Sequence, residues 1–256
     1  MLQMSAKSKK ATQAQAETLA KKVEHFTKIE IECLIQTFNV LQAEQVGRGK
    51  ATHGLDRWTF RGILQNIFGL TNAMMIDGVF RSFDKDGDGI INVEEWIEGL
   101  SVLLRGTLDE KIKHCFQVYD LNDDKVIARE EICHMLKQSL LKQPNEEDPD
   151  EAIKDVVEIT MKRMDHDHDG LLSFKDFEKS VQKENLLLEA FGTCLPDPTV
   201  ILQIIGCHKF LPDVLNLIHF FFLSFRVLRS LSTLYFKSNK NKETTHIHVH
   251  LQIYHE

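Results

Sequence analysis

A stretch of twelve residues, 84–95, constrains what this chain can fold into more than any other feature. Its sequence, DKDGDGIINVEE, places side-chain or backbone oxygens at loop positions one, three, five, seven and twelve, which are Asp84, Asp86, Asp88, Ile90 and Glu95. Oxygen ligands at this spacing surround one hard divalent cation. The stretch, which we call loop one, therefore predicts a calcium-binding loop.

Two further residues of loop one support this prediction. Gly89 stands at position six, where the chain must turn sharply with a positive φ that glycine adopts without steric cost. Asn92 stands at position nine, where a side-chain oxygen or a bridging water completes the coordination sphere. The alternative is a solvated acidic turn, which would not require oxygen-bearing residues and a glycine at all these positions.

The apolar pattern around loop one recurs twice further along the chain. Residues eight, four and one before each loop are apolar or aromatic: Ile76, Phe80, Phe83; Ile112, Phe116, Tyr119; Val157, Met161, Met164. The same holds for positions eight, thirteen and seventeen: Ile91, Trp96, Leu100; Ile127, Ile132, Leu136; Leu172, Phe177, Val181. Each unit is thus two amphipathic helices around a loop, and it cannot bury both stripes alone. We expect an all-α fold with two lobes of paired units, in which short two-strand bridges join Leu55 to Ile91 and Ile127 to Leu172.

Loop two, residues 120–131, keeps most of the ligand pattern. The candidate ligands are Asp120, Asn122, Asp124, the Val126 carbonyl and Glu131. Lys125 replaces the glycine at position six, and Ala128 offers no ligand at position nine. Both changes weaken binding, so the sequence leaves open whether this loop holds metal.

Loop three, residues 165–176, is closer to the full pattern. Its candidate ligands are Asp165, Asp167, Asp169, the Leu171 carbonyl and Asp176. Because the Asp176 side chain is one methylene shorter than glutamate, six-fold coordination is favoured and Mg²⁺ becomes a candidate beside Ca²⁺. His166 and His168 stand at positions that we expect to point outward, and the hard oxygen ligands argue against a zinc site.

The segments around these loops carry further expectations. Residues 48–59 have Asp56 as their only carboxylate, so we interpret them as a vestigial first unit. Residues 1–25 are rich in Lys, Ala and Gln and predict a frayed or solvent-exposed helix, whose lysines form either a solvated leader or a contact for an acidic surface such as a microtubule. Thr107 and Glu110 predict a capping box, residues 143–151 an exposed acidic linker, and residues 185–191 a lid over the second lobe.

Composition narrows the class of protein. The formal net charge of −7 disfavours nucleic acid as a partner. The N-terminus lacks the pattern of a secretory signal, and Leu2 stands where myristoylation requires glycine, so we expect no membrane anchor by that route. The 5 cysteines have no CxxC spacing, which favours reduced intracellular thiols.

Residues 199–256 have a different character. The apolar run 214–225 is too short for a transmembrane helix. His246, His248 and His250 alternate along a strand-like segment and could coordinate a metal, but a biased segment is the favoured interpretation. We hypothesise that this tail derives from an alternative or mis-predicted 3′ exon.

The three loops and their spacing resemble the EF-hand superfamily. Residues 69–99, 103–113 and 139–198 more closely resemble the calaxins, ciliary calcium sensors related to the neuronal calcium sensors. The resemblance covers about residues 20–198. It implies a component of the axonemal outer dynein arm and its docking complex, located in the cytoplasm and cytoskeleton of a cilium or flagellum, with calcium ligands in all three loops.

The expected organisation is a leader (residues 1–25), a first lobe (26–106, with its intact unit at 71–106), a second lobe (107–191, units 107–142 and 152–187) and a divergent tail (192–256). The sequence has no nucleophile–base pair, phosphate-binding glycine loop or open catalytic metal site, so we expect no enzymatic activity. The main hypothesis is a calcium-responsive adaptor. The alternatives are a calcium buffer, a constitutive structural subunit of the docking complex, and a regulator of a membrane target.

Overall fold

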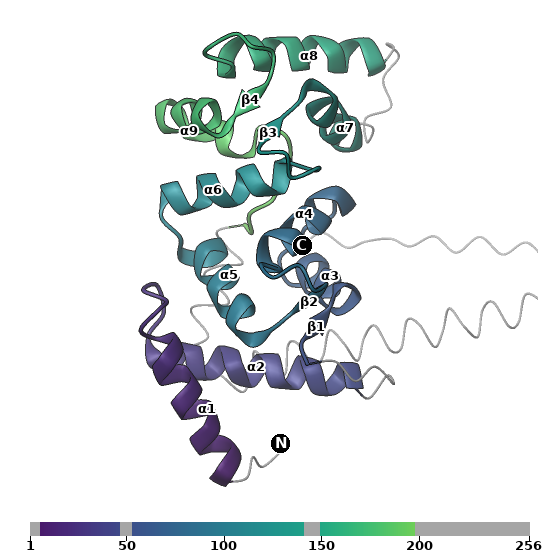
Figure 1. The fold of residues 1–256 in the computed structure, drawn as a ribbon. Coiled ribbons are helices and arrows are strands. Elements are labelled where there is room, and N and C mark those ends of the chain that lie inside the picture. Colours follow the sequence, from purple (N-terminus) through teal and green to yellow (C-terminus); the bar gives the residue numbers. More distant parts are fainter. Residues whose placement is uncertain (1–5, 47–52, 141–148, 198–256) are drawn as a thin grey trace, which may run out of the picture. The chain divides into compact units, whose positions relative to one another are not determined.

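The structure, a computed structural model, describes residues 6–46, 53–140 and 149–197. All of these lie in the first of two compact units, Met1–Leu211, and the second, Pro212–Glu256, lies wholly outside the described residues. The described chain is built of helix–loop–helix units (Figure 1). In order, its elements are α1 (Ala6–Leu19), α2 (Lys28–Val46), β1 (Leu55–Asp56), α3 (Arg57–Asn66), α4 (Ala73–Phe83), β2 (Ile90–Ile91), α5 (Val93–Arg105), α6 (Leu108–Tyr119), β3 (Val126–Ile127), α7 (Arg129–Leu140), α8 (Pro149–Met164), β4 (Leu172–Ser173), α9 (Phe174–Lys183) and η1 (Asn185–Glu189).

Two short antiparallel bridges join the loops in pairs. Leu55 lies opposite Ile91 in the β1–β2 bridge, and Ile127 lies opposite Leu172 in the β3–β4 bridge. Both registers are the ones that the repeat predicted. The predicted fold class, all-α with paired units, is therefore confirmed.

The apolar stripes of the repeat form the core. All the residues predicted from the pattern around the three loops are buried. In the first pair, the Phe60 ring lies 4.9 Å from Phe83 and 6.2 Å from Trp96 between ring centroids. In the second pair, Tyr119 contacts Phe177 and Phe191 at 6.1 and 5.1 Å. Edge-to-face rings at these distances add to the energy of burial.

The two pairs meet along α4 and α6, which pack side by side (Figure 1). Gly78 allows the close approach, because a Cβ at this position would lie 2.6 Å from the Val118 carbonyl oxygen. One turn further along, the Ser82 hydroxyl lies 3.2 Å from Nδ1 of the buried His114. The entering helices of loops one and two thus share one interface.

The N-terminal helix corrects one expectation. Instead of lying exposed in solvent, α1 packs against α2 along a buried stripe of Thr12, Ala16 and Leu19, and Val23, just after the helix, is also buried. Lys22, which follows the helix, pairs with Glu94 of α5. The stripe has helical spacing, but Thr and Ala are too weakly apolar for it to stand out in the sequence.

Other segments were predicted with mixed success. The capping box of Thr107 and Glu110 is confirmed at the start of α6. Residues 185–191 do cover the second pair, as a 3-10 turn, η1, followed by the buried Phe191. The expected linker at residues 143–151 is wrong at its end, because α8 begins at Pro149. The other residues of that linker up to 148, and the tail beyond 197 with His246, His248 and His250, lie outside the described residues.

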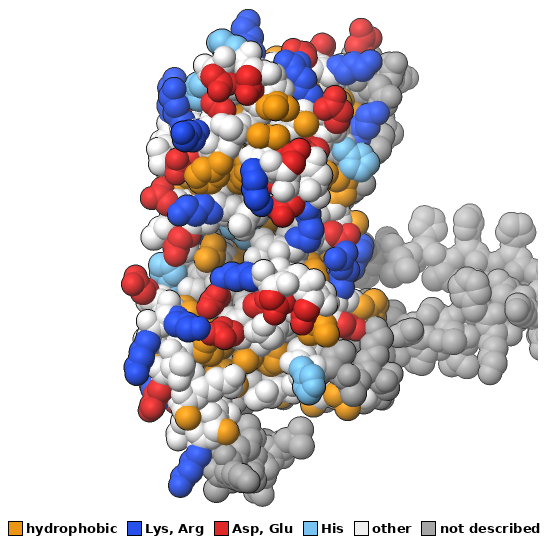
Figure 2. Space-filling model, in the orientation of Figure 1, with side chains coloured by type: hydrophobic (Ala, Val, Ile, Leu, Met, Phe, Trp, Pro, Cys, Tyr) orange, Lys and Arg blue, Asp and Glu red, His pale blue; other side chains and the backbone are white. Residues whose placement is uncertain are grey.

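The surface of the described residues mixes both signs of charge, and Figure 2 shows acidic and basic side chains interspersed on one face. Ion pairs on the surface of the described residues join neighbouring segments, such as Lys85 with Glu98 and Arg163 with Glu184. Among the described helices, none is both long and apolar enough to cross a membrane.

Candidate calcium-binding loops

Loop one gathers three carboxylates at the end of α4. One side-chain oxygen from each of Asp84, Asp86 and Asp88 lies within 4.8 Å of the other two. Asp84 Oδ1 is buried and accepts no hydrogen bond. A buried acceptor without a donor is costly unless a cation satisfies it. The loop therefore fits a divalent cation held by oxygen ligands.

The same backbone network shapes all three loops. The amide of position six donates to the carboxylate of position one: Gly89 to Asp84 at 2.9 Å, Lys125 to Asp120 at 3.0 Å and Gly170 to Asp165 at 3.0 Å. The amide of position seven donates to position five: Ile90 to Asp88 at 2.7 Å, Val126 to Asp124 at 3.0 Å and Leu171 to Asp169 at 2.8 Å. These bonds turn the carboxylates toward the centre of each loop.

The carboxylate at position twelve ties each loop to its exit helix. Glu95 accepts from the amides of Lys85 (2.8 Å) and Asn92 (3.0 Å). Glu131 makes the equivalent bonds in loop two, to Leu121 (2.9 Å) and Ala128 (2.8 Å).

In loop three, Asp176 accepts from the amides of His166 and Ser173 at 3.3 Å each. Both distances exceed those in the other loops, as expected for the shorter side chain.

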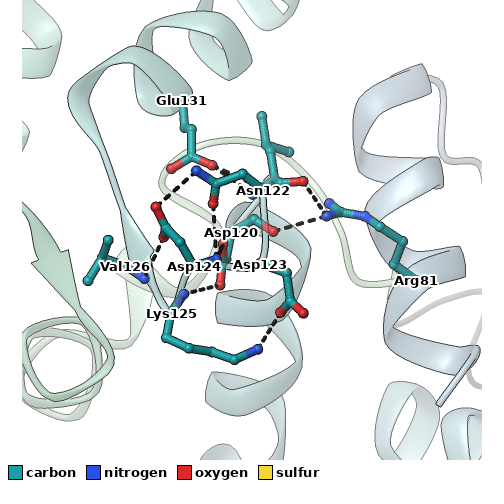
Figure 3. A network of polar contacts seen from close by, with 9 residues as sticks. Arg81, Asp120, Asn122, Asp123, Asp124, Lys125, Val126 and Glu131 are labelled. Atoms are coloured by element: carbon teal, nitrogen blue, oxygen red, sulfur yellow. Dashed lines mark hydrogen bonds and ion pairs between the residues drawn. The ribbon is translucent and has the colours of Figure 1, made fainter. Parts of the chain in front are cut away.

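Loop two is complete in its backbone but differs in its side chains (Figure 3). Lys125 has a φ of 72°, in the left-handed region where a side chain costs about 1–2 kcal/mol. Its ammonium group turns away from the loop centre and pairs with Asp123. The side-chain Nδ2 of Asn122 donates to Asp124 Oδ2 at 2.9 Å, so two of the candidate ligands are already hydrogen-bonded to each other within the loop.

A residue from the first pair holds loop two in place. Arg81 on α4 donates from Nη1 to the carbonyl oxygens of Asp120 (3.1 Å) and Leu121 (2.5 Å) (Figure 3). A guanidinium group forms stronger hydrogen bonds than a neutral donor. Loop two is therefore anchored to the helix that carries loop one.

Loop three again gathers three carboxylates: one side-chain oxygen from each of Asp165, Asp167 and Asp169 lies within 4.8 Å of the other two. Burial raises the pKa of Asp165, but amide donors from Gly170 and His168 outweigh it and hold this pKa below its ordinary value. The expectation that both histidines point outward holds for the exposed His168 but is wrong for His166. His166 is half-buried, and its Nε2 lies 3.1 Å from Ser180 Oγ.

Comparisons with known proteins agree with this geometry. The model of the EF-hand domain pair matches residues 73–137 and 109–182. Calaxin of Xenopus laevis is 60% identical over 195 residues, which are 76% of this chain and 93% of the relative. The chain belongs to the calaxin family. Calaxins of Danio rerio (60% identical, 76% of this chain and 92% of the relative) and Homo sapiens (59%, 75% and 90%) are similarly close. This member of the calaxin family is a calcium-binding protein of the EF-hand type.

The predicted ligands of this calaxin-family chain all lie in the described loops, and their role as metal ligands stays a prediction. The residues that offer a backbone carbonyl at position seven, Ile90, Val126 and Leu171, stand at or next to the start of a bridge strand.

Sequence reasoning missed two supporting residues. Gln45 is buried, and its amide bonds to Gly54 O (3.1 Å) and to the Asp56 amide (3.0 Å), which fixes the described part of the vestigial loop. Arg81 is the other, and nothing in its local sequence distinguishes it.

Proposed function

We propose that this chain is a calcium-responsive adaptor, without enzymatic activity, of the axonemal outer dynein arm and its docking complex. The observation that supports this proposal most directly is that loop one brings three carboxylates together, with Asp84 Oδ1 buried and unpartnered, in a member of the calaxin family. The dynein partner and the ciliary location rest on the resemblance to calaxins. Calcium would be held by Asp84, Asp86, Asp88, the Ile90 carbonyl and Glu95, and by the corresponding residues of loop three.

Bound calcium supplies the positive charge that offsets the clustered carboxylates. Glu95 joins the start of loop one to the start of α5, because it accepts amides from both ends of the loop. When Glu95 shifts toward the three aspartates, α5 changes its angle to α4. This change uncovers apolar residues such as Trp96 and Leu100, which a partner helix can cover.

Loop three works in the same way with a weaker link. Asp176 accepts from the Ser173 hydroxyl at the start of α9 but reaches the His166 amide, at the start of the loop, only at 3.3 Å, so its link to that end is weaker than that of Glu95. The shorter reach favours six ligands, and Mg²⁺ therefore competes better at loop three than at loop one. Loop two, with its internal Asn122–Asp124 bond, binds more weakly than either.

The first experiment separates a sensor from a buffer. Calcium is titrated into the full chain by calorimetry while an anilinonaphthalene dye reports newly exposed apolar surface. A sensor gives heat and a rise in dye fluorescence at micromolar calcium; heat without dye binding supports the buffer. Glu95→Gln should abolish binding at loop one, whereas Glu94→Gln, at the neighbouring position that pairs with Lys22, should leave it intact.

The second experiment tests the partner. The purified chain is added to demembranated axonemes that retain docking complexes but have been stripped of endogenous calaxin. We expect saturable binding at docking sites and a calcium-dependent change of waveform that Glu95→Gln removes. Binding with no response to calcium would indicate a structural subunit, and no binding would overturn the dynein proposal.

A further inference from the structure

The segment after α9 is held on α6 by a buried cluster. Tyr119, the last residue of α6, donates from its hydroxyl to the Gly192 carbonyl at 2.7 Å. Glu189 Oε1 accepts from the amides of Cys194 and Leu195 at 2.9 Å each, which folds the segment on itself. Phe191 is fully buried, with its ring 5.1 Å from the ring of Tyr119.

Two thiols face each other inside this cluster. Cys115 on α6 and Cys194 on the covering segment are both fully buried, and their Sγ atoms lie 3.2 Å apart although 79 residues separate them in sequence. Cys194 Sγ also lies 3.5 Å from the Tyr119 hydroxyl. Among the other cysteines of the described residues, Cys33 and Cys133 are partly exposed. Burial and proximity therefore distinguish Cys115 and Cys194 from the other described cysteines.

The surroundings keep this pair reduced while the segment stays closed. Burial, aided by the neighbouring Cys194, raises the pKa of the Cys115 thiol well above its ordinary value. The thiol rather than the reactive thiolate is then present at neutral pH. Oxidation thus requires a transient opening of the segment, and reclosure brings the two sulfur atoms back together.

We propose that Cys115 and Cys194 form a reversible intramolecular disulfide that staples residues 185–197 onto α6. With hydrogen peroxide as oxidant, one thiol becomes a sulfenic acid and releases water. The second thiol attacks that sulfur, the S–S bond forms, and a second water leaves. Two thiols lose two hydrogen atoms and two electrons in total, and the peroxide is reduced to two waters. A thiol reductant reverses the reaction by thiol–disulfide exchange.

The staple has a structural consequence close to loop two. Tyr119 immediately precedes Asp120, the first residue of that loop, and it also carries the hydrogen bond to the covering segment. In the oxidised protein the segment can no longer lift from the C-terminal turn of α6. This inference stands on the thiol geometry and does not depend on the dynein proposal.

The decisive test uses the full chain with Cys33, Cys133 and Cys207 replaced by serine, so that only the proposed pair remains. After treatment with hydrogen peroxide, peptide mapping should show the segments of Cys115 and Cys194 cross-linked, with a mass loss of two hydrogens that dithiothreitol restores. Thiols that stay free, or that become sulfinic acids without a cross-link, would overturn the proposal. Mapping of the unsubstituted chain gives the same answer if the triple variant does not fold.

A second readout tests the staple itself. Hydrogen exchange of the amides of residues 185–195 should slow at least about tenfold on oxidation, because the cross-link suppresses local opening. The matched variant Cys194→Ser, treated with the same peroxide, should show no such slowing. Equal exchange rates in the oxidised and reduced forms of the pair would contradict the staple.

Discussion

At the scale of single residues, Lys125 carries a cost that the rest of its loop tolerates. Its φ of 72° is required for the amide to reach Asp120, and the equivalent positions in the other loops are Gly89 (φ 80°) and Gly170 (φ 85°). Lys125→Gly should therefore raise the free energy of unfolding by about 1 kcal/mol. It also removes a positive charge beside the carboxylates, so calorimetry should show tighter calcium binding at loop two. Asparagine tolerates this φ better than lysine, so the stability of Lys125→Asn should lie between those of the unsubstituted chain and Lys125→Gly. Equal stability of all three would show that the strain is relieved elsewhere.

Ala128 leaves the start of α7 without a side-chain cap. At the equivalent positions, Asn92 and Ser173 accept amide hydrogen bonds from the first turns of α5 and α9. Ala128→Thr should supply such an acceptor and raise stability by about 1 kcal/mol in chemical denaturation. Ala128→Val has the same shape without the hydroxyl and serves as the control. A gain of equal size in both variants would attribute the effect to packing instead of capping.

Glu30 makes stability depend on pH below the physiological range. It is buried, and although burial raises its pKa, donors from Arg105 (2.7 Å) and the Thr27 amide (2.6 Å) outweigh this and lower the pKa from 4.5 to about 2. Because the pKa of the folded state is the lower one, this contribution is present above pH 4.5 and is lost as pH falls toward 2. The contribution of Glu30 to the free energy of unfolding has an upper limit of about 3 kcal/mol.

Glu30→Gln tests this ion pair. Stability at pH 7 should fall, and the loss of stability between about pH 4.5 and 2 should become shallower than in the unsubstituted chain. Glu32→Gln, on the same helix, is the control and should keep the original slope. Thermal unfolding followed by circular dichroism over this pH range measures both.

At the scale of elements, the contact between α4 and α6 depends on Gly78. A methyl group there would lie 2.6 Å from the Val118 carbonyl oxygen, so Gly78→Ala should destabilise the fold by about 1–3 kcal/mol. Gly62, inside α3, provides the opposite case, since a Cβ there would meet only Asn66 Nδ2 at 3.9 Å. Gly62→Ala should stabilise by up to about 1 kcal/mol, because alanine favours helix. If both changes had the same sign, helix propensity and not the interface would control this contact.

The elements also show where sequence reasoning succeeds and where it stops. The register of both bridges follows from the repeat, because position eight of each loop is fixed relative to its ligands and must be buried. The contact of α1 with α2 does not follow, since its stripe is built from Thr12 and Ala16 as much as from Leu19. The roles of Gln45, Arg81 and His166 depend on partners that the chain brings near only after folding. Local periodicity carries no information on such contacts.

At the scale of the whole described molecule, Arg81 links the two pairs of EF-hands by a polar contact beside their apolar interface. Arg81 lies one helical turn before Asp84, the first ligand of loop one, and donates to two carbonyl oxygens at the start of loop two. A movement of α4 on binding at loop one therefore displaces a group that shapes loop two. Coupling of this kind is a free energy shared by the two sites.

Arg81→Ala should then have two effects. It should lower stability by about 1–3 kcal/mol, because two carbonyl oxygens lose a charged donor, and it should make calcium binding at loops one and two independent. In the unsubstituted chain, Glu95→Gln should weaken calcium binding at loop two as well as abolish it at loop one, whereas in the Arg81→Ala background the same change should affect loop one alone.

Arg57→Ala, which removes an exposed guanidinium 3.9 Å from Asp77, is the matched control and should preserve the coupling. Calorimetric titration of the unsubstituted chain, the two single variants and the double variant completes this double-mutant cycle. An equal effect of Glu95→Gln in both backgrounds would show that the two pairs respond to calcium separately in spite of their shared interface.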